Sequence, residues 1–280
     1  MAETLTRTSI AEIERRLDDL RDCDVGWQRT SVATHMAWVP PEWSRAVDRV
    51  VRGLGSRIPS RTLLLRPDPD AKEDGLDATI EREHFDGEAK VSAEIVRIRL
   101  RGRTAAAPAS VVVPLQLPDL PVFLRWRGRP PFGRPQYEDM VGVADRLIVD
   151  SSEWGGRLRP AYLRLGESFT RIVVSDLAWE RSLGYRAGLA ALWPGIRSMR
   201  VLDVRGPFAD AALLHGWLRS RLKTNIRLRH VDARTLSRVA VDGQAVRAPR
   251  RLARSFSDQL SDQLEVYVRD RVYEAAVRAV

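Results

Sequence analysis

Residues 91–101 read VSAEIVRIRLR, and the second half of this segment alternates apolar residues with arginine. Successive side chains of a β-strand point to opposite faces of the sheet, so the alternation predicts a strand with one buried and one solvated face. Arg97, Arg99 and Arg101 would share the solvated face. We favour an ordinary wet sheet face as the interpretation of these arginines, with a phosphate-binding face as the alternative.

The neighbouring segments extend this strand into a sheet with helices. Residues 9–22 predict a helix in which Ser9 and Glu12 form a capping box, and Pro41 opens a second helix. Short apolar runs bounded by Pro, Gly and acidic turns predict the remaining strands. These strands are 30–39, 61–66, 76–85, 111–117, 122–126 and 146–149.

The second half of the chain mixes the same two kinds of element. A stretch rich in Gly and Pro at 151–160 marks a boundary, which predicts two domains, 1–153 and 154–280. The helices expected after it are 176–193, 209–222 and one from about 264, and the strands are 199–204, 226–231 and 236–241. We therefore expect an α/β or α+β fold with two domains, each a mixed sheet covered by helices.

Composition restricts the class of protein. No run of about 18 apolar residues is free of charge, and Cys23 is the single cysteine, so we expect a cytoplasmic protein with no membrane association. The net charge of +9 invites a nucleic-acid interpretation. However, nearly all of the positive charge is arginine spread along the whole chain and interleaved with acidic residues, which makes nucleic acid an unlikely partner.

Sequence motifs for catalysis or cofactor binding are missing. The chain has neither a phosphate-cradling glycine loop nor a G-x-S-x-G nucleophile motif, and its four histidines lie far apart. The acidic segment 70–81 superficially follows a calcium loop, but Lys72 occupies a ligand position. We therefore expect no catalytic residue, no cofactor and no metal.

Several motifs together carry a resemblance to a known family. Residues 114–128 read PLQLPDLPVFLRWRG, and the further segments are 59–65 (PSRTLLL), 145–152 (DRLIVDSS), 175–181 (SDLAWER), 213–222 (LLHGWLRSRL) and 270–275 (DRVYEA). In this order they resemble the OpcA family. The resemblance implies a non-catalytic protein that binds glucose-6-phosphate dehydrogenase, promotes its active oligomer and raises its activity, which supplies NADPH through the oxidative pentose phosphate pathway.

The resemblance also has a departure. Control of cyanobacterial relatives through thioredoxin depends on pairs of cysteines, and an intramolecular disulfide switch is not possible with Cys23 alone. Two other functions stay open as alternatives. One is a nucleic-acid or polyanion-binding protein, which a local cluster of arginine would support, and the other is an enzyme acting on a sugar phosphate.

Six motif residues are candidates for contact with the partner protein. They are Asp119, Trp126, Arg127, Asp176, Trp179 and Arg181. Trp and Arg are over-represented at binding hot spots, which favours contact at Trp126 and Arg127. The equally good alternative is that Trp126 closes the core and Arg127 is solvated. For the helix expected at 176–193, a structural role is favoured over docking.

Overall fold

The computed structural model describes residues 2–22, 31–54, 59–85, 91–248, 260 and 268–280. The chain divides into two compact units. Unit 1 comprises Met1–Ile148 with Phe256–Tyr267, and unit 2 comprises Val149–Ser255 with Val268–Val280. Sheets with both parallel and antiparallel pairs and helices packed on them confirm the expected mixed α/β class.

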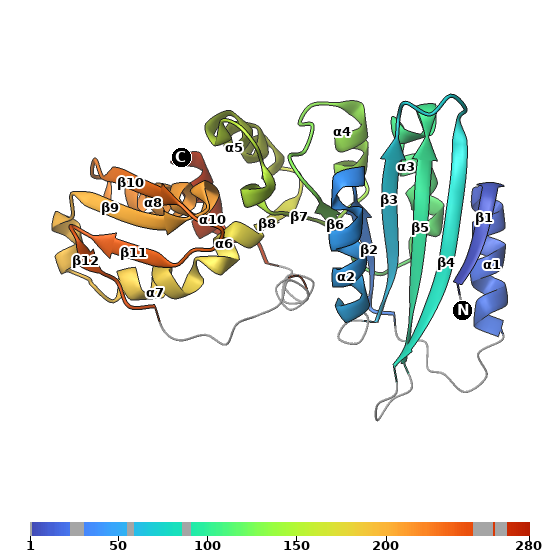
Figure 1. Ribbon diagram of the computed structural model, residues 1–280, viewed down its shortest axis with the longest axis horizontal. Helices are drawn as coiled ribbons and strands as arrows, with labels where there is room; N and C mark the ends of the chain where they lie inside the picture. Colours follow the sequence, from blue (N-terminus) through green and yellow to red (C-terminus); the bar gives the residue numbers. More distant parts are fainter. Residues whose placement is uncertain (1, 23–30, 55–58, 86–90, 249–259, 261–267) are drawn as a thin grey trace. The chain divides into compact units, whose positions relative to one another are not determined.

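Unit 1 contains a mixed sheet with the strand order β1-β4-β5-β3-β2-β6-β7 (Figure 1). The strands are β1 (Ala2–Thr8), β2 (Ala33–Trp38), β3 (Ser60–Asp68), β4 (Gly75–Phe85), β5 (Val91–Arg101), β6 (Val122–Trp126) and β7 (Arg146–Val149). The helices are α1 (Ile10–Asp22), α2 (Ser44–Leu54), α3 (Ala109–Leu115) and α4 (Pro135–Gly142), with short 3-10 turns η1 (Pro41–Trp43) and η2 (Gly102–Ala105). The pairs from β5 to β7 are parallel, and β1-β4-β5 is antiparallel.

One row of apolar side chains crosses the sheet of unit 1. Strand register aligns Ile80, Val96, Leu63, Met36 and Leu124 on neighbouring strands, and none of these side chains is exposed. The buried faces of α1 and α3 belong to the same unit, and α1 packs on β4 and on α3. This face of the sheet is therefore the main hydrophobic core of unit 1.

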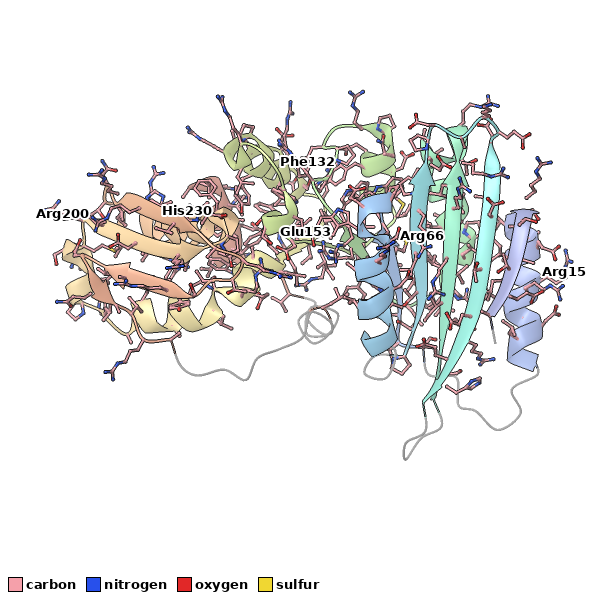
Figure 2. The ribbon with its side chains drawn as sticks, viewed as in Figure 1. Arg15, Arg66, Phe132, Glu153, Arg200 and His230 are labelled. Carbon is pink, nitrogen blue, oxygen red and sulfur yellow. The ribbon has the colours of Figure 1, made fainter. Side chains whose placement is uncertain are left out.

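The opposite face of the sheet is only partly covered. Helix α2 packs Val47 and Val51 against Leu64 and Ile95 in a smaller apolar cluster. Beyond that cluster the same face carries the arginines of β5, as the alternation in the sequence predicted. Figure 2 shows Arg66 beside α2, where its guanidinium group bonds Asp48 at 2.9 Å.

The strand predicted at 111–117 is wrong, because Ala109–Leu115 forms helix α3. Three consecutive valines favour a strand by propensity, but burial follows a helical spacing. Val111, Val112 and Leu115 are buried, whereas Val113 is 48% exposed. A strand would have placed Val111 and Val113 on one face. Tertiary packing therefore overrides the local preference of these residues.

Unit 2 contains a smaller mixed sheet with the strand order β10-β9-β11-β12. The strands of this unit are β8 (Val173–Asp176), β9 (Val201–Gly206), β10 (Arg227–Asp232), β11 (Arg238–Val241) and β12 (Gln244–Ala245). Its helices are α5 (Leu158–Ser168), α6 (Leu177–Arg181), α7 (Leu183–Ala190), α8 (Phe208–Leu222) and α10 (Arg271–Arg278), with turns η3 (Ser151–Glu153) and η4 (Gly195–Ser198).

Helix α8 connects the parallel strands β9 and β10 and packs on the sheet that they form. The core beneath it combines Leu214 and Leu218 of α8 with Leu202, Val204 and Val239 of the strands. Among the described residues, no helix is long and apolar enough to cross a membrane.

The single helix predicted at 176–193 is also wrong, because two helices, α6 and α7, meet at Ser182. The Ser182 hydroxyl donates to the carbonyl oxygen of Trp179 at 2.7 Å, which competes with helical hydrogen bonding. The segment before it, 173–176, forms the short strand β8. The helix expected from about 264 lies partly outside the described residues, and its described part is α10.

Candidate functional site

Three segments that are distant in sequence meet at Arg181 in unit 2. Its guanidinium group donates two hydrogen bonds to Asp150, at 2.7 and 3.0 Å, and one to the hydroxyl of Ser152 at 2.9 Å. It also lies 3.4 Å from the carboxylate of Asp210. A bidentate pair of this kind fixes both partners in orientation as well as in distance.

Asp176 caps helix α6 and joins it to the turn after β7. Its Oδ1 accepts hydrogen bonds from the backbone amides of Ala178 at 2.9 Å and Ser151 at 3.0 Å. Its Oδ2 lies 3.4 Å from the hydroxyl of Tyr273, which is on α10. The sequence correctly predicted that Asp176 begins a helix, but not the other two contacts.

A second aspartate ties α10 to α6. Asp270 caps α10 by accepting from the backbone amides of Val272 and Tyr273, at 2.8 and 2.9 Å, and its other oxygen accepts from Trp179 Nε1 at 2.7 Å. The guanidinium group of Arg186 lies 3.5 Å from the centre of the Trp179 ring, within cation–π distance. Two of the predicted motif residues, Asp176 and Trp179, are thus bound to the same helix, α10.

We call Asp150, Asp176, Arg181 and Asp210 the aspartate cluster. It places the carboxyl groups of Asp150 and Asp210 beside one guanidinium group, and the carboxyl group of Asp176 is close enough to Asp150 to feel its charge. Burial and the nearby charge of Asp150 raise the pKa of Asp176 to about 7. Burial also raises the pKa of Asp210 to about 6, although Arg181 opposes the shift. The cluster therefore retains protons at pH values where free aspartate has lost them.

The aspartate cluster is closed to substrates. Asp150, Asp176 and Asp210 are between 0 and 2% exposed, and only Arg181 reaches the surface, with 20% of its side chain exposed. Beside it lies a hollow of about 350 Å³, lined by Ser151, Ser152, Trp154, Phe208, Asp232 and Arg234 among others. None of the three buried carboxyl groups lines this hollow. The cluster is thus suited to holding segments of unit 2 together.

The arginine face of unit 1 is the other charged feature that the sequence singled out. Arg97 pairs with Glu81 at 2.6 Å and with Asp48 at 3.2 Å, and Arg99 pairs with Asp68 at 2.5 Å. Arg101 lies 3.4 Å from Asp77. Carboxylates already neutralise these arginines. Arg99 is solvated, as expected, whereas Arg97 and Arg101 are largely covered by their acidic partners, and this pairing weakens the phosphate-binding alternative.

One segment of the chain matches a known protein-family model. Residues 52–164 match the family model described as the glucose-6-phosphate dehydrogenase subunit N-terminal domain, OpcA type. This segment is similar to an OpcA-type domain. A search of curated proteins finds no match. The match confirms the resemblance for the motifs at 59–65, 114–128 and 145–152, and it includes Asp150, the first member of the aspartate cluster.

Within this segment, Trp126 is in the core. It is 1% exposed, stacks on Trp38 with ring centroids 4.9 Å apart and meets Tyr137 edge-on at 5.5 Å. Arg127 is half-buried, with its guanidinium group 4.4 Å from the ring centre of Trp43. Asp119 is exposed, with a positive φ of 61°. Asp119 and Arg127 are therefore the two contact candidates of unit 1 with accessible side chains.

Groups that could bind a metal or act as a general base were also searched for among the described residues. Among the residues that the structure describes, no group of three His, Cys, Asp or Glu side chains could hold a metal ion. His35 is 1% exposed in the middle of β2, and neither ring nitrogen has a hydrogen-bond partner. Burial, with a smaller effect of Arg125, lowers the pKa of His35 to about 4.

Sequence reasoning found Asp176, Trp179 and Arg181 but missed their partners. Asp150 and Asp210 are 31 and 29 residues from Arg181 along the chain, so no local spacing relates them. One sequence pattern could have indicated these capping contacts. An aspartate stands at the start of a helix or turn in three motifs, 145–152, 175–181 and 270–275. Each of these aspartates, Asp150, Asp176 and Asp270, caps the element that follows it.

Proposed function

We propose that this chain is a non-catalytic assembly factor that binds glucose-6-phosphate dehydrogenase, promotes its active oligomer and raises its activity. The observation that carries the proposal is the family match over residues 52–164, whose description names a subunit of that enzyme. On this proposal the protein acts in the cytoplasm, alongside the dehydrogenase, and its physiological output is NADPH. It needs no cofactor or metal of its own.

Activation then follows from selective binding. A protein that binds the active form of an enzyme more tightly than the inactive form shifts the population toward the active form by the ratio of the two affinities. A tenfold shift needs a difference of about 1.4 kcal/mol in binding free energy, which a modest interface provides. No covalent step by the activator is required.

Burial of the unusual acidic groups supports a binding role over catalysis. An enzyme acting on a sugar phosphate needs a cavity in which arginines converge beside an acid or base with a shifted pKa. Asp176 and Asp210 have such shifts but are 1% and 0% exposed. A substrate could reach them only after unit 2 opens.

The loop that follows α3 is our candidate contact surface for the dehydrogenase. It belongs to the 114–128 motif, and the exposed residues on and beside it are Val113, Pro114, Pro118 and Asp119. Val113 is a β-branched apolar residue with 48% of its surface exposed. Apolar and proline side chains on a short, constrained segment bind with little loss of conformational entropy.

Val113→Glu tests this surface, and Leu163→Glu is the matched control. Leu163 lies on α5, is 60% exposed and falls inside the same family match. Both substitutions place a charge at an exposed apolar position and should leave the fold intact. We expect Val113→Glu to weaken the complex with the dehydrogenase at least tenfold and Leu163→Glu to leave it unchanged. Equal effects, or none from Val113→Glu, would remove the α3 loop from the interface.

The assembly proposal itself is tested by mixing the purified chain with the dehydrogenase of the same organism. NADPH formation and the mass of the complex are followed together. We expect a complex of defined mass and a faster rate. Absence of both, under conditions where the dehydrogenase alone turns over, would overturn the proposal.

A further inference from the structure

The ends of helices α8 and α10 form a strongly basic hollow in unit 2. Its volume is about 1010 Å³. The lining residues are Arg219, Ser220, Arg221, Lys223, Thr224, Asn225, Ala275, Arg278 and Ala279. Four of these nine side chains are cationic, and none is acidic. We call this feature the basic hollow.

The two helices pack tightly enough to give the hollow a fixed floor. Gly216 of α8 faces the backbone of α10, and a Cβ atom at this position would clash with the carbonyl oxygen of Ala276. Arg219 donates from Nη1 to the carbonyl oxygen of Ala279 at 3.0 Å, which links the ends of the two helices. The cations of the hollow therefore stand on two helices that are held in fixed register.

Helix electrostatics explain only part of this charge. Cations at a helix C-terminus are favourable because the last carbonyl groups are unsatisfied, and Arg219 serves that purpose. Arg278 pairs with Glu274 at 3.5 Å. Arg221 and Lys223 are exposed, and in the described part of the chain neither has a carboxylate partner. Their mutual repulsion is relieved when an anion occupies the hollow.

The backbone at Lys223 adds a second indication. Lys223 ends α8 in the left-handed conformation, with φ 55° and ψ 28°. Glycine is the usual residue at such a helix end, because a Cβ atom is disfavoured there. At this strained position the chain carries a cation that points to the same hollow as three arginines.

The lining also defines the chemistry of the ligand. A phosphate group carries a charge of about −1.5 to −2, so two of them balance four cations. Thr224 and Asn225 offer neutral hydrogen-bond donors to phosphate oxygens, whereas the hydroxyl of Ser220 donates to the carbonyl oxygen of Trp217 at 2.7 Å. No aromatic ring lines the hollow for base stacking, which disfavours a single-stranded nucleic acid. We propose that the basic hollow binds a small molecule carrying two or more phosphate groups.

The test of this site does not depend on the assembly function, because the ligand is added to the chain alone. Calorimetric titration of the full chain with tripolyphosphate, pyrophosphate and inorganic phosphate measures the site directly. We expect affinity to rise in the order phosphate, pyrophosphate, tripolyphosphate and to weaken as salt increases. Equal, negligible heats for all three would overturn the proposal.

The variant Arg221→Ser/Lys223→Gly removes two charges without disturbing any hydrogen bond or ion pair found in the structure. Glycine at 223 suits the left-handed backbone, so thermal stability should be kept or raised. We expect at least a tenfold loss of affinity for tripolyphosphate. The matched control, Arg205→Ser/Arg238→Ser, removes two exposed charges on β9 and β11 of the same unit and should lose less than twofold.

Two outcomes would contradict the inference. An equal loss of affinity in both double variants would show diffuse attraction to net charge instead of a site. A single-stranded oligonucleotide that binds more tightly than tripolyphosphate at equal phosphate concentration, and loses that affinity in Arg221→Ser/Lys223→Gly, would assign the hollow to nucleic acid. Neither outcome depends on binding of the dehydrogenase.

Discussion

Asp176→Asn isolates the proton that the aspartate cluster retains. The asparagine Oδ1 can still accept from the amides of Ser151 and Ala178, and its Nδ2 can donate to the hydroxyl oxygen of Tyr273. The substitution thus keeps the shape of the site and both bonds from the backbone amides, reverses the direction of the bond with Tyr273, and removes the titration of the group.

The direction of the pH effect follows from the pKa of Asp176. Its pKa is about 7 in the folded chain and ordinarily 3.8, so between these two pH values the folded state binds the proton more tightly than the unfolded state does. This group's contribution to stability is complete below pH 3.8 and is lost as pH rises through 7. One proton corresponds to about 1.4 kcal/mol per pH unit, or about 2 to 3 kcal/mol between pH 5 and 7.

Urea unfolding of wild type and Asp176→Asn from pH 5 to pH 8, followed by circular dichroism and tryptophan fluorescence, measures this effect. Taking the difference between the two proteins cancels every other titrating group. We expect the stability of Asp176→Asn relative to wild type to increase by about 2 to 3 kcal/mol from pH 5 to 7. A difference that is constant over this range would refute the assignment of a retained proton to Asp176.

Three further substitutions test the packing. Arg181→Met leaves the buried carboxyl groups of the aspartate cluster without their cation. The free energy of unfolding, measured by urea titration, should fall by about 3 to 5 kcal/mol. The loss should be smaller at low pH, where the carboxyl groups are protonated. His35→Leu removes two buried ring nitrogens that have no hydrogen-bond partner. The pKa of His35 is about 4 in the folded chain, so the wild type loses folding stability as pH falls from 6.5 toward 4. The variant should therefore have a higher melting temperature than wild type at pH 5. Gly188→Ala forces a Cβ atom onto the carbonyl oxygen of Arg247 and should lower the melting temperature by several degrees, whereas Gly166→Ala, which has open space, should not.

The sequence predicted the elements whose periodicity is local and strong. The alternation at 96–101 placed Arg97, Arg99 and Arg101 on one face of β5, and the strand register confirms this, although Arg99 alone of the three is largely exposed. Ser9 accepts the backbone amide of Glu12 at 3.2 Å, as the expected cap of α1 requires. These features depend only on neighbours within a few residues.

Features set by distant contacts were not predictable in the same way. Valines 111–113 have strand propensity, and only packing of α3 within unit 1 makes them helical. Strand β8 has four residues, too few for a recognisable alternation. The aspartate cluster depends on Arg181 meeting Asp150 and Asp210 across about 30 residues of chain. The motif resemblance indicated the importance of these residues before their geometry was known.

We propose that the chain acts on glucose-6-phosphate dehydrogenase by binding its active oligomer. The most direct test is the rate of NADPH formation against dehydrogenase concentration, with and without a saturating amount of the chain. We predict strong activation at low enzyme concentration, where the dehydrogenase is dissociated, and activation that declines toward one as the enzyme assembles by itself. A constant ratio at all concentrations would contradict promotion of the oligomer, and a ratio of one throughout would contradict activation altogether.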